Sequence, residues 1–198
     1  MGLEKQSTKV LIAGDTDGKF AKLIKTISSA HAKAGPFDAV FCVGAFFGGD
    51  AEETRKAMIP YLTGQQTVPV PTFFILGKEP EGQLPFALPE EGCELCKNLA
   101  YLGRKGVREI ASCGGLKVAF LSGVHSGAYS LPRPPSEDEM AYDRSYREED
   151  MKFLRARVDA NTCVILPLPL ALPSRLTHFE PIFPRFPLAF PSFPGSLC

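Results

Sequence analysis

Three short apolar runs, each ending in glycine, constrain the fold of this chain more than any other feature of its sequence. The runs are Val10–Ala13, "AVFCVG" and "PTFFILG", and helical or polar stretches separate them. Continuous rather than alternating apolar residues are typical of strands that are buried on both faces. Because repeated units of this kind pair in parallel, the sequence predicts an α/β fold with a mostly parallel sheet.

Two of the connecting segments have the pattern of helices. Within residues 19–33, apolar side chains recur at the spacing of one buried helix face. These side chains are Phe20, Leu23, Ile24 and Ile27. Gly35 and Pro36 then provide a stop signal, and a charged helix is expected at about residues 50–61.

The middle of the chain has a different pattern of apolar and glycine residues. Short apolar runs at Ala100–Leu102, Val107–Ile110 and Leu116–Ser122 are separated by glycine pairs and by "GRKG". Tight glycine turns are typical of antiparallel hairpins, so we expect a second, hairpin-rich half.

A further helix and strand complete the predicted domain. Ser136, with an acidic residue three positions on, is a helix-start signature, and the helix is expected to end near Val158. Residues 164–166 are predicted to form one more strand. We therefore expect one domain at residues 9–166, preceded by a flexible N-terminus at residues 1–8.

Residues 167–198 do not resemble the rest of the chain. Their prolines recur every two to four positions among leucine and phenylalanine, which excludes a continuous helix or a central strand. We expect this proline-rich tail to be disordered. One interpretation is a proline-rich ligand for a partner protein, although the usual basic flank is missing. The other, favoured by composition, is an end that does not continue the domain naturally, such as read-through of a retained intron.

Composition and charge point to no particular class of macromolecular partner. The 22 basic and 22 acidic side chains give a formal net charge of zero, so bulk electrostatics demand neither a nucleic-acid nor a membrane partner. The start "MGLEKQSTK" is polar, and no secretory signal or membrane span is expected. The six cysteines are expected to stay reduced. Cys93 and Cys96 form a C-x-x-C without a second pair, which favours ordinary thiols over a zinc or redox site.

The turn at residues 14–18 offers a candidate site. Its spacing does not match a phosphate-binding loop, and no hydroxyl residue follows Lys19. Asp15 and Asp17 stand two apart after a buried strand, at the edge where parallel sheets bind ligands, and are candidate ligands of a hard cation. Acidic residues here also cap a following helix, and from this turn alone the structural interpretation is favoured.

Five strings, taken in order, carry a family resemblance: "VLIAGDTDGKF", "FDAVFCVGAFFG", "PTFFILG", "EGCELCKNLAYLGRKGV" and "GLKVAFLSG". Over about residues 9–123 the chain resembles the amino-terminal domain of the CwfJ family, spliceosome-associated proteins related to the lariat-RNA debranching enzyme. The resemblance implies a calcineurin-like metallophosphoesterase fold, a four-layer α/β/β/α sandwich that is here partly truncated at its C-terminus. It also implies a nuclear protein whose partners are spliceosome components and the debranching enzyme.

The same resemblance implies that the metal site is largely lost. Asp15-Thr16-Asp17 falls on the D-x-H motif of active phosphoesterases, so the aspartate is kept and the histidine is not. Ala45 stands where the second motif has its bridging carboxylate, and Lys78 occupies the asparagine position of the third. The distal histidines have no counterpart in "VILPLPLALP". We expect no catalytic residue and no cofactor, with Asp15 and Asp17 as vestigial metal candidates.

The resulting hypothesis is a non-catalytic domain that binds protein or RNA in pre-mRNA splicing or intron-lariat turnover, as an activator of the debranching enzyme. The candidate RNA contacts are the basic residues Arg104, Lys105, Arg108 and Lys117. Four cations near a hairpin are also typical of a solvated edge. The alternative hypotheses are a metal-dependent phosphodiesterase that uses Asp15, Asp17 and His125, and a truncated product with little function of its own.

Overall fold

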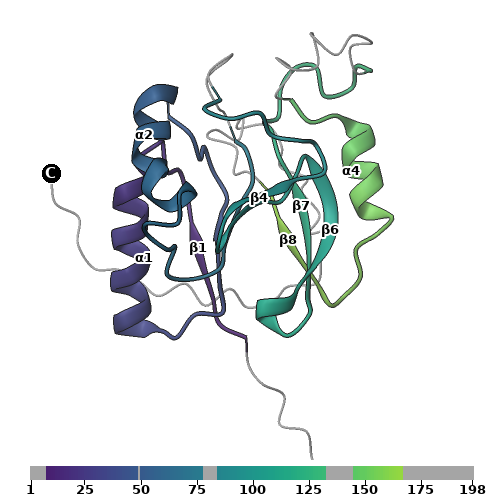
Figure 1. Ribbon diagram of the computed structural model, residues 1–198. Coiled ribbons are helices and arrows are strands. Elements are labelled where there is room, and N and C mark those ends of the chain that lie inside the picture. Colours follow the sequence, from purple (N-terminus) through teal and green to yellow (C-terminus); the bar gives the residue numbers. More distant parts are fainter. Residues whose placement is uncertain (1–7, 49, 78–83, 133–144, 167–198) are drawn as a thin grey trace, which may run out of the picture.

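The computed structural model describes residues 8–48, 50–77, 84–132 and 145–166. Within these ranges the chain forms two β-sheets and three α-helices, as Figure 1 shows, and the prediction of an α/β fold is confirmed. None of the helices in these ranges is long and apolar enough to span a bilayer. The proline-rich tail at residues 167–198, Ser136, Lys78 and all but the last residue of the expected N-terminal extension lie outside the described residues.

The first sheet contains five strands in the order β1-β2-β3-β5-β4. They are β1 (Val10–Ala13), β2 (Ala39–Cys42), β3 (Thr72–Phe74), β4 (Cys93–Cys96) and β5 (Leu99–Tyr101). Four of them are parallel, and β4 pairs antiparallel with β5 at the edge. The parallel register brings the turns that follow β1, β2 and β3 to the same edge of the sheet, which is called the strand-end edge below.

Helices α1 (Phe20–Ala34) and α2 (Ala51–Leu62) cover one face of this sheet (Figure 1). The apolar face predicted for the first helix is buried, with Phe20 and Ile27 each 1% exposed. The second helix begins where Asp50 accepts a hydrogen bond of 2.8 Å from the backbone N–H of Glu53. Under the helices the core is aromatic, and the rings of Phe46 and Phe74 stack with centroids 4.0 Å apart.

The second sheet has the order β6-β7-β8. Strands β6 (Lys105–Ile110) and β7 (Leu116–Leu121) form the predicted hairpin, joined through a short 3₁₀ turn, η1 (Ala111–Cys113). Helix α4 (Glu148–Arg155) follows, and β8 (Thr162–Ile165) then pairs in parallel with β7.

One strand that the sequence places in the hairpin-rich half belongs to the first sheet instead. The run at residues 100–102 overlaps β5, which pairs in parallel with β3. The first and last residues of β5, Leu99 and Tyr101, are buried. A three-residue apolar run carries no information about its partner, and here burial beside β3 decides it.

The two sheets pack face to face through an apolar cluster. Phe41 and Ile75 of the first sheet meet Val118 and Phe120 of the second, and α4 covers the outer face of the second sheet through Leu154. The layers therefore run helices, sheet, sheet, helix. The end of β3 is hydrogen-bonded to the end of β7, which places the strand-end edge of the first sheet beside the end of β7.

Candidate functional site

The turns that follow β1 and β2 are hydrogen-bonded to each other. The backbone N–H groups of Thr16 and Gly18 donate to the carbonyl oxygens of Ala45 and Phe46, at 2.8 and 3.1 Å. In the opposite direction, the N–H of Ala45 donates to Oδ1 of Asp15 at 2.8 Å. The carboxylate predicted as a metal ligand therefore serves as the acceptor that holds the second turn against the first.

Glycine is required where these turns meet because there is no space for a side chain. A Cβ atom on Gly44 would lie 2.1 Å from Oδ1 of Asp15, and one on Gly77, after β3, would lie 2.8 Å from the backbone N of Ala45. A Cβ on Gly48 would lie 2.5 Å from the carbonyl oxygen of the first turn. Three successive strand ends are thus closed by backbone packed on backbone.

The described residues of this edge do not fit a two-metal site. Asp15 and Asp17 are both exposed, and Asp17 adopts a left-handed conformation with φ of 49°. Ala45 has no atom that can bridge two cations, as such sites require. Nowhere in the described ranges do three or more histidine, cysteine, aspartate or glutamate side chains gather in a way that could hold a metal ion, so Asp15, Asp17 and His125 do not form such a group.

A buried hydroxyl, which sequence reasoning missed, extends the edge into the second sheet. Ser122 follows β7 and donates a hydrogen bond of 2.7 Å to the carbonyl oxygen of Gly103. Its Oγ also accepts a bond of 3.1 Å from the N–H of Leu76, and the N–H of Gly123 donates to the carbonyl oxygen of Leu76 at 2.7 Å. The only signal in the sequence was a strand that ends in Ser-Gly. Ser122 therefore joins the ends of β3, β5 and β7.

His125 lies just beyond this junction, in an exposed position as expected for a turn residue. Its ring packs against two half-buried tyrosines, with centroid distances of 5.0 Å to Tyr129 and 5.8 Å to Tyr146. The two tyrosine rings are 6.1 Å apart and nearly perpendicular. Burial, and to a lesser degree Tyr129, raises the pKa of Tyr146. We call these three residues the aromatic trio.

The four basic residues predicted to contact RNA do not share one surface. Side chains alternate along β6, so Lys105 points toward α4 and Arg108 toward the first sheet. Nζ of Lys105 forms an ion pair of 2.6 Å with Asp150, which is 0% exposed. Arg108 donates to the carbonyl oxygen of Glu91 and lies over the ring of Phe120.

The remaining two cations also have acidic or carbonyl partners. Arg104 donates to the carbonyl oxygen of Ser145 at 3.1 Å and lies 3.8 Å from Glu90. Lys117 lies 3.8 Å from Asp159 at the surface. Contact of these residues with RNA stays a prediction, and Lys105 in particular has a structural role that competes with it.

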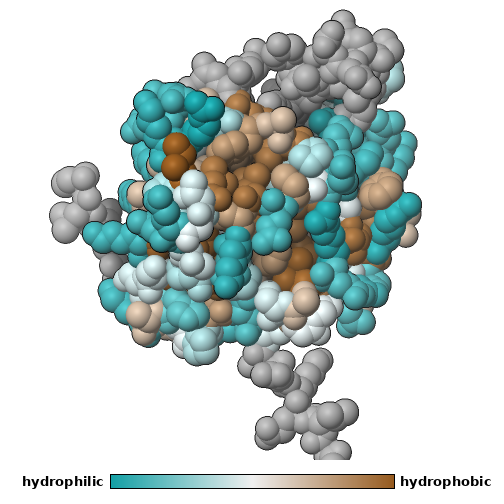
Figure 2. Space-filling view, viewed as in Figure 1, coloured by the Kyte–Doolittle hydropathy of each residue, from teal (hydrophilic) through white to brown (hydrophobic). Residues whose placement is uncertain are grey.

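Between the sheets, on the side of β5 and β6, lies a cavity of about 330 Å³. Its lining is mixed: apolar side chains such as Phe73 and Ile110 lie beside the charged Glu94, Glu109 and Arg108. Figure 2 shows hydrophobic surface gathered between the helical half and the second sheet on this face. The mixed charges of the lining favour no single class of ligand.

The described cysteines form no disulfide. Burial raises the pKa of the Cys42 thiol to about 12, and it also raises the pKa of Cys93 and Cys96 in the C-x-x-C pair. Because the thiolate is the form that ligates metals and attacks disulfides, raised pKa values disfavour both roles. The half-buried pair instead packs against the core under α1 and α2.

Comparison with curated proteins gives three informative similarities. The chain is 41% identical over 126 residues to the CWF19-like protein 1 homolog of Caenorhabditis elegans, which covers 64% of this chain and 22% of the relative. It is 36% identical over 155 residues to CWF19-like protein 1 of Mus musculus, a match that covers 77% of this chain and 26% of the relative. In its matched part the chain belongs to the Cwf19/CwfJ family.

The resemblance inferred from the sequence is thereby confirmed at the level of the family. A third relative, zinc finger CCCH domain-containing protein 64 of Arabidopsis thaliana, is 32% identical over 183 residues, covering 86% of this Cwf19/CwfJ chain and 28% of the plant protein. The chain thus spans about a fifth to a quarter of the length of the curated relatives it matches. No protein-family model matches the chain.

A matched pair of glycine substitutions tests the packing of the turns in this Cwf19/CwfJ chain. Gly44→Ala places a methyl group against Asp15, and we expect the free energy of unfolding to fall by roughly 2 kcal/mol or more. Gly14→Ala is the control, since a Cβ there meets nothing within 4 Å. Its free energy of unfolding should stay unchanged or rise by up to about 1 kcal/mol. Urea denaturation measures both, and equal losses would contradict the packing argument.

A matched pair of lysine substitutions separates structural from surface cations in the same family member. Lys105→Ala removes one charged partner of the buried Asp150 carboxylate, which keeps its hydrogen bond from the N–H of Arg147, so we expect the free energy of unfolding to fall by roughly 2 kcal/mol. Lys117→Ala removes a surface pair and should leave the thermal midpoint unchanged within error. A thermal midpoint for Lys105→Ala equal to that of the parent chain would contradict this structural role and favour Lys105 as an RNA contact.

Proposed function

We propose that this chain is a non-catalytic, metallophosphoesterase-like domain of a splicing-associated protein, which acts by binding. The layer order of helices, sheet, sheet and helix supports that fold, as does the convergence of three glycine turns at one sheet edge. The observation that carries the proposal is the hydrogen bond that the backbone N–H of Ala45 donates to Asp15. Position 45 thus contributes only its backbone to Asp15, whereas a two-metal phosphoesterase needs a bridging carboxylate there.

Splicing is proposed from the family. The relatives named CWF19-like protein 1 support a splicing-associated role, and the resemblance of the turns to phosphoesterases suggests intron-lariat turnover as the step. On this proposal the chain acts in the nucleus, contacts spliceosome components, and stimulates the debranching enzyme without hydrolysing the branch itself.

The second candidate function is a metal-dependent phosphodiesterase with a reduced site around Asp15 and Asp17. Both carboxylates are exposed at the end of β1, which is the observation in its favour. Oxygen ligands of this kind suit hard divalent cations, but two carboxylates fill only part of a coordination shell.

Calorimetric titration with Mn²⁺ and with Zn²⁺ distinguishes the two candidates. With Asp15 already accepting a backbone hydrogen bond and Ala45 opposite it, we expect no binding tighter than millimolar and no Mn²⁺-dependent hydrolysis of an aryl phosphodiester. Asp15→Ala is the control and should change neither result. Tight binding of two ions, together with hydrolysis that Asp15→Ala abolishes, would establish the phosphodiesterase instead.

Affinity purification from nuclear extract tests the partners. We expect the full chain to retain spliceosome components, and to raise the rate at which added debranching enzyme opens a branched RNA. Ribonuclease treatment of the extract separates partners held by protein contacts from those held through RNA. Recovery of no splicing factor, and an unchanged debranching rate, would contradict the proposed function.

A further inference from the structure

The aromatic trio contains a tilted pair of rings, His125 and Tyr129, of which His125 is exposed to solvent. The rings of His125 and Tyr129 lie 5.0 Å apart with an interplanar angle of 31°, while Tyr146 meets His125 at 64° from the side. His125 is exposed and both tyrosines are half-buried. A flat ligand that approaches from solvent would therefore stack on the exposed imidazole, with the tyrosines behind it.

The rings are held on a backbone that is fixed by hydrogen bonds between two segments of the chain. The N–H of Tyr146 donates to the carbonyl oxygen of Val124 at 3.2 Å, and the N–H of Glu148 donates to that of Tyr129 at 2.9 Å. A parallel bridge also joins Val124 to Ser145. Because the geometry exists before a ligand binds, little conformational entropy is lost on stacking.

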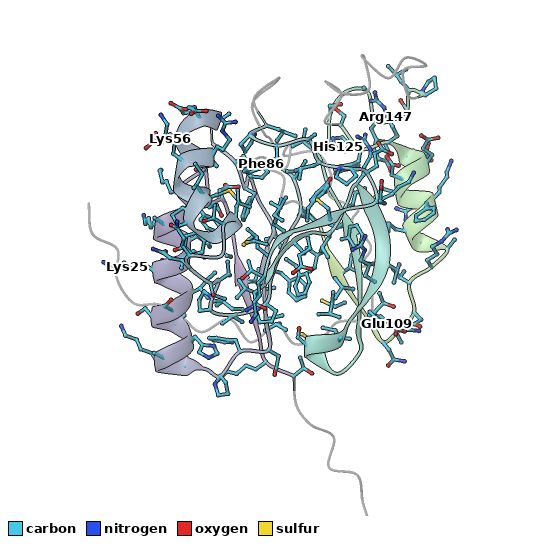
Figure 3. All side chains as sticks on the ribbon, viewed as in Figure 1. Lys25, Lys56, Phe86, Glu109, His125 and Arg147 are labelled. Carbon is cyan, nitrogen blue, oxygen red and sulfur yellow. The ribbon has the colours of Figure 1, made fainter. Side chains whose placement is uncertain are left out.

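Two guanidinium groups lie behind the trio, and both are largely covered: Arg147 is 5% exposed, and Arg104 lies 3.8 Å from Glu90. Arg147 donates to the carbonyl oxygen of Ala128 at 2.6 Å, next to Tyr129, and Arg104 donates to that of Ser145 at 3.1 Å, next to Tyr146. Figure 3 shows His125 and Arg147 at the same end of the molecule.

Two of the three carboxylates in the first turn of α4 have cationic partners. Glu148 pairs with Lys152 at 3.1 Å, and Asp150 pairs with Lys105 at 2.6 Å. Guanidinium groups behind the rings disfavour a second cation such as a methylated lysine on them, whereas a nucleobase stacks on aromatic rings without needing a charged partner.

We propose that His125, Tyr129 and Tyr146 form a stacking site for an unpaired base of single-stranded RNA. Every base offers a π-face to an aromatic ring, so the site takes RNA without strict sequence preference and binds purines more tightly than pyrimidines. This inference rests on the proposed function and deepens it, because it names where the domain contacts RNA and by which chemistry.

Proton NMR of the histidine rings in the full chain tests the site. The chain has three histidines, and loss of one signal in His125→Ala assigns that of His125. On titration with a ten-nucleotide oligoadenylate we expect the His125 ring signal to move upfield, through the ring current of the stacked base, while the His31 signal stays in place. The dissociation constant for this RNA should rise about 5- to 150-fold in His125→Ala.

Two tyrosine variants and two competitor ligands provide the controls. Tyr129→Phe keeps the ring and should bind as the parent chain does, whereas Tyr129→Leu should weaken binding. A ten-unit abasic ribose-phosphate should bind weakly and leave the His125 signal unmoved. Equal affinity for the abasic chain, or a His125 shift with a trimethyllysine peptide but not with RNA, would overturn the proposal.

The outcomes also separate this inference from the proposed function. If the chain retains splicing factors but its His125 signal does not move on addition of RNA, the stacking site is contradicted and the proposed function is not. If RNA shifts the His125 signal but no splicing factor is recovered, the proposed function is contradicted and the stacking site is not.

Discussion

The hydrogen bond between the Asp15 carboxylate and the N–H of Ala45 fixes the geometry on which the strand-end edge depends. It brings the turn after β2 so close to the turn after β1 that position 44 accepts no side chain. The turn after β3 is packed on the same backbone at Gly77. An edge that in parallel sheets commonly opens into a ligand site is here filled by the chain itself.

Ser122 connects the ends of β3, β5 and β7 through one buried hydroxyl, so the segment that begins at Gly123 leaves from a fixed point. The exposed ring of His125 lies two residues beyond that point.

Sequence reasoning found the elements whose signal is local and missed those decided by distant contacts. The apolar runs located β1, β2 and β3, and the spacing of Phe20 and Ile27 located α1. The absence of a ligand atom at Ala45 was also readable. The burial of Asp150 was not, because an acid in a charged helix start is indistinguishable from a solvated one until Lys105 is placed beside it. The aromatic trio could not be predicted either, since its rings come from segments that are apart in the sequence.

The two sheets are built from consecutive stretches of chain that do not interleave. Every strand of the first sheet lies before residue 102, and every strand of the second lies after residue 104. The apolar cluster beneath α1 and α2 also draws all its members from the stretch that ends at Tyr101. As the chain leaves the ribosome, the helical half can therefore bury its own core before the second sheet has been synthesised. The second sheet then assembles on a surface that is already formed.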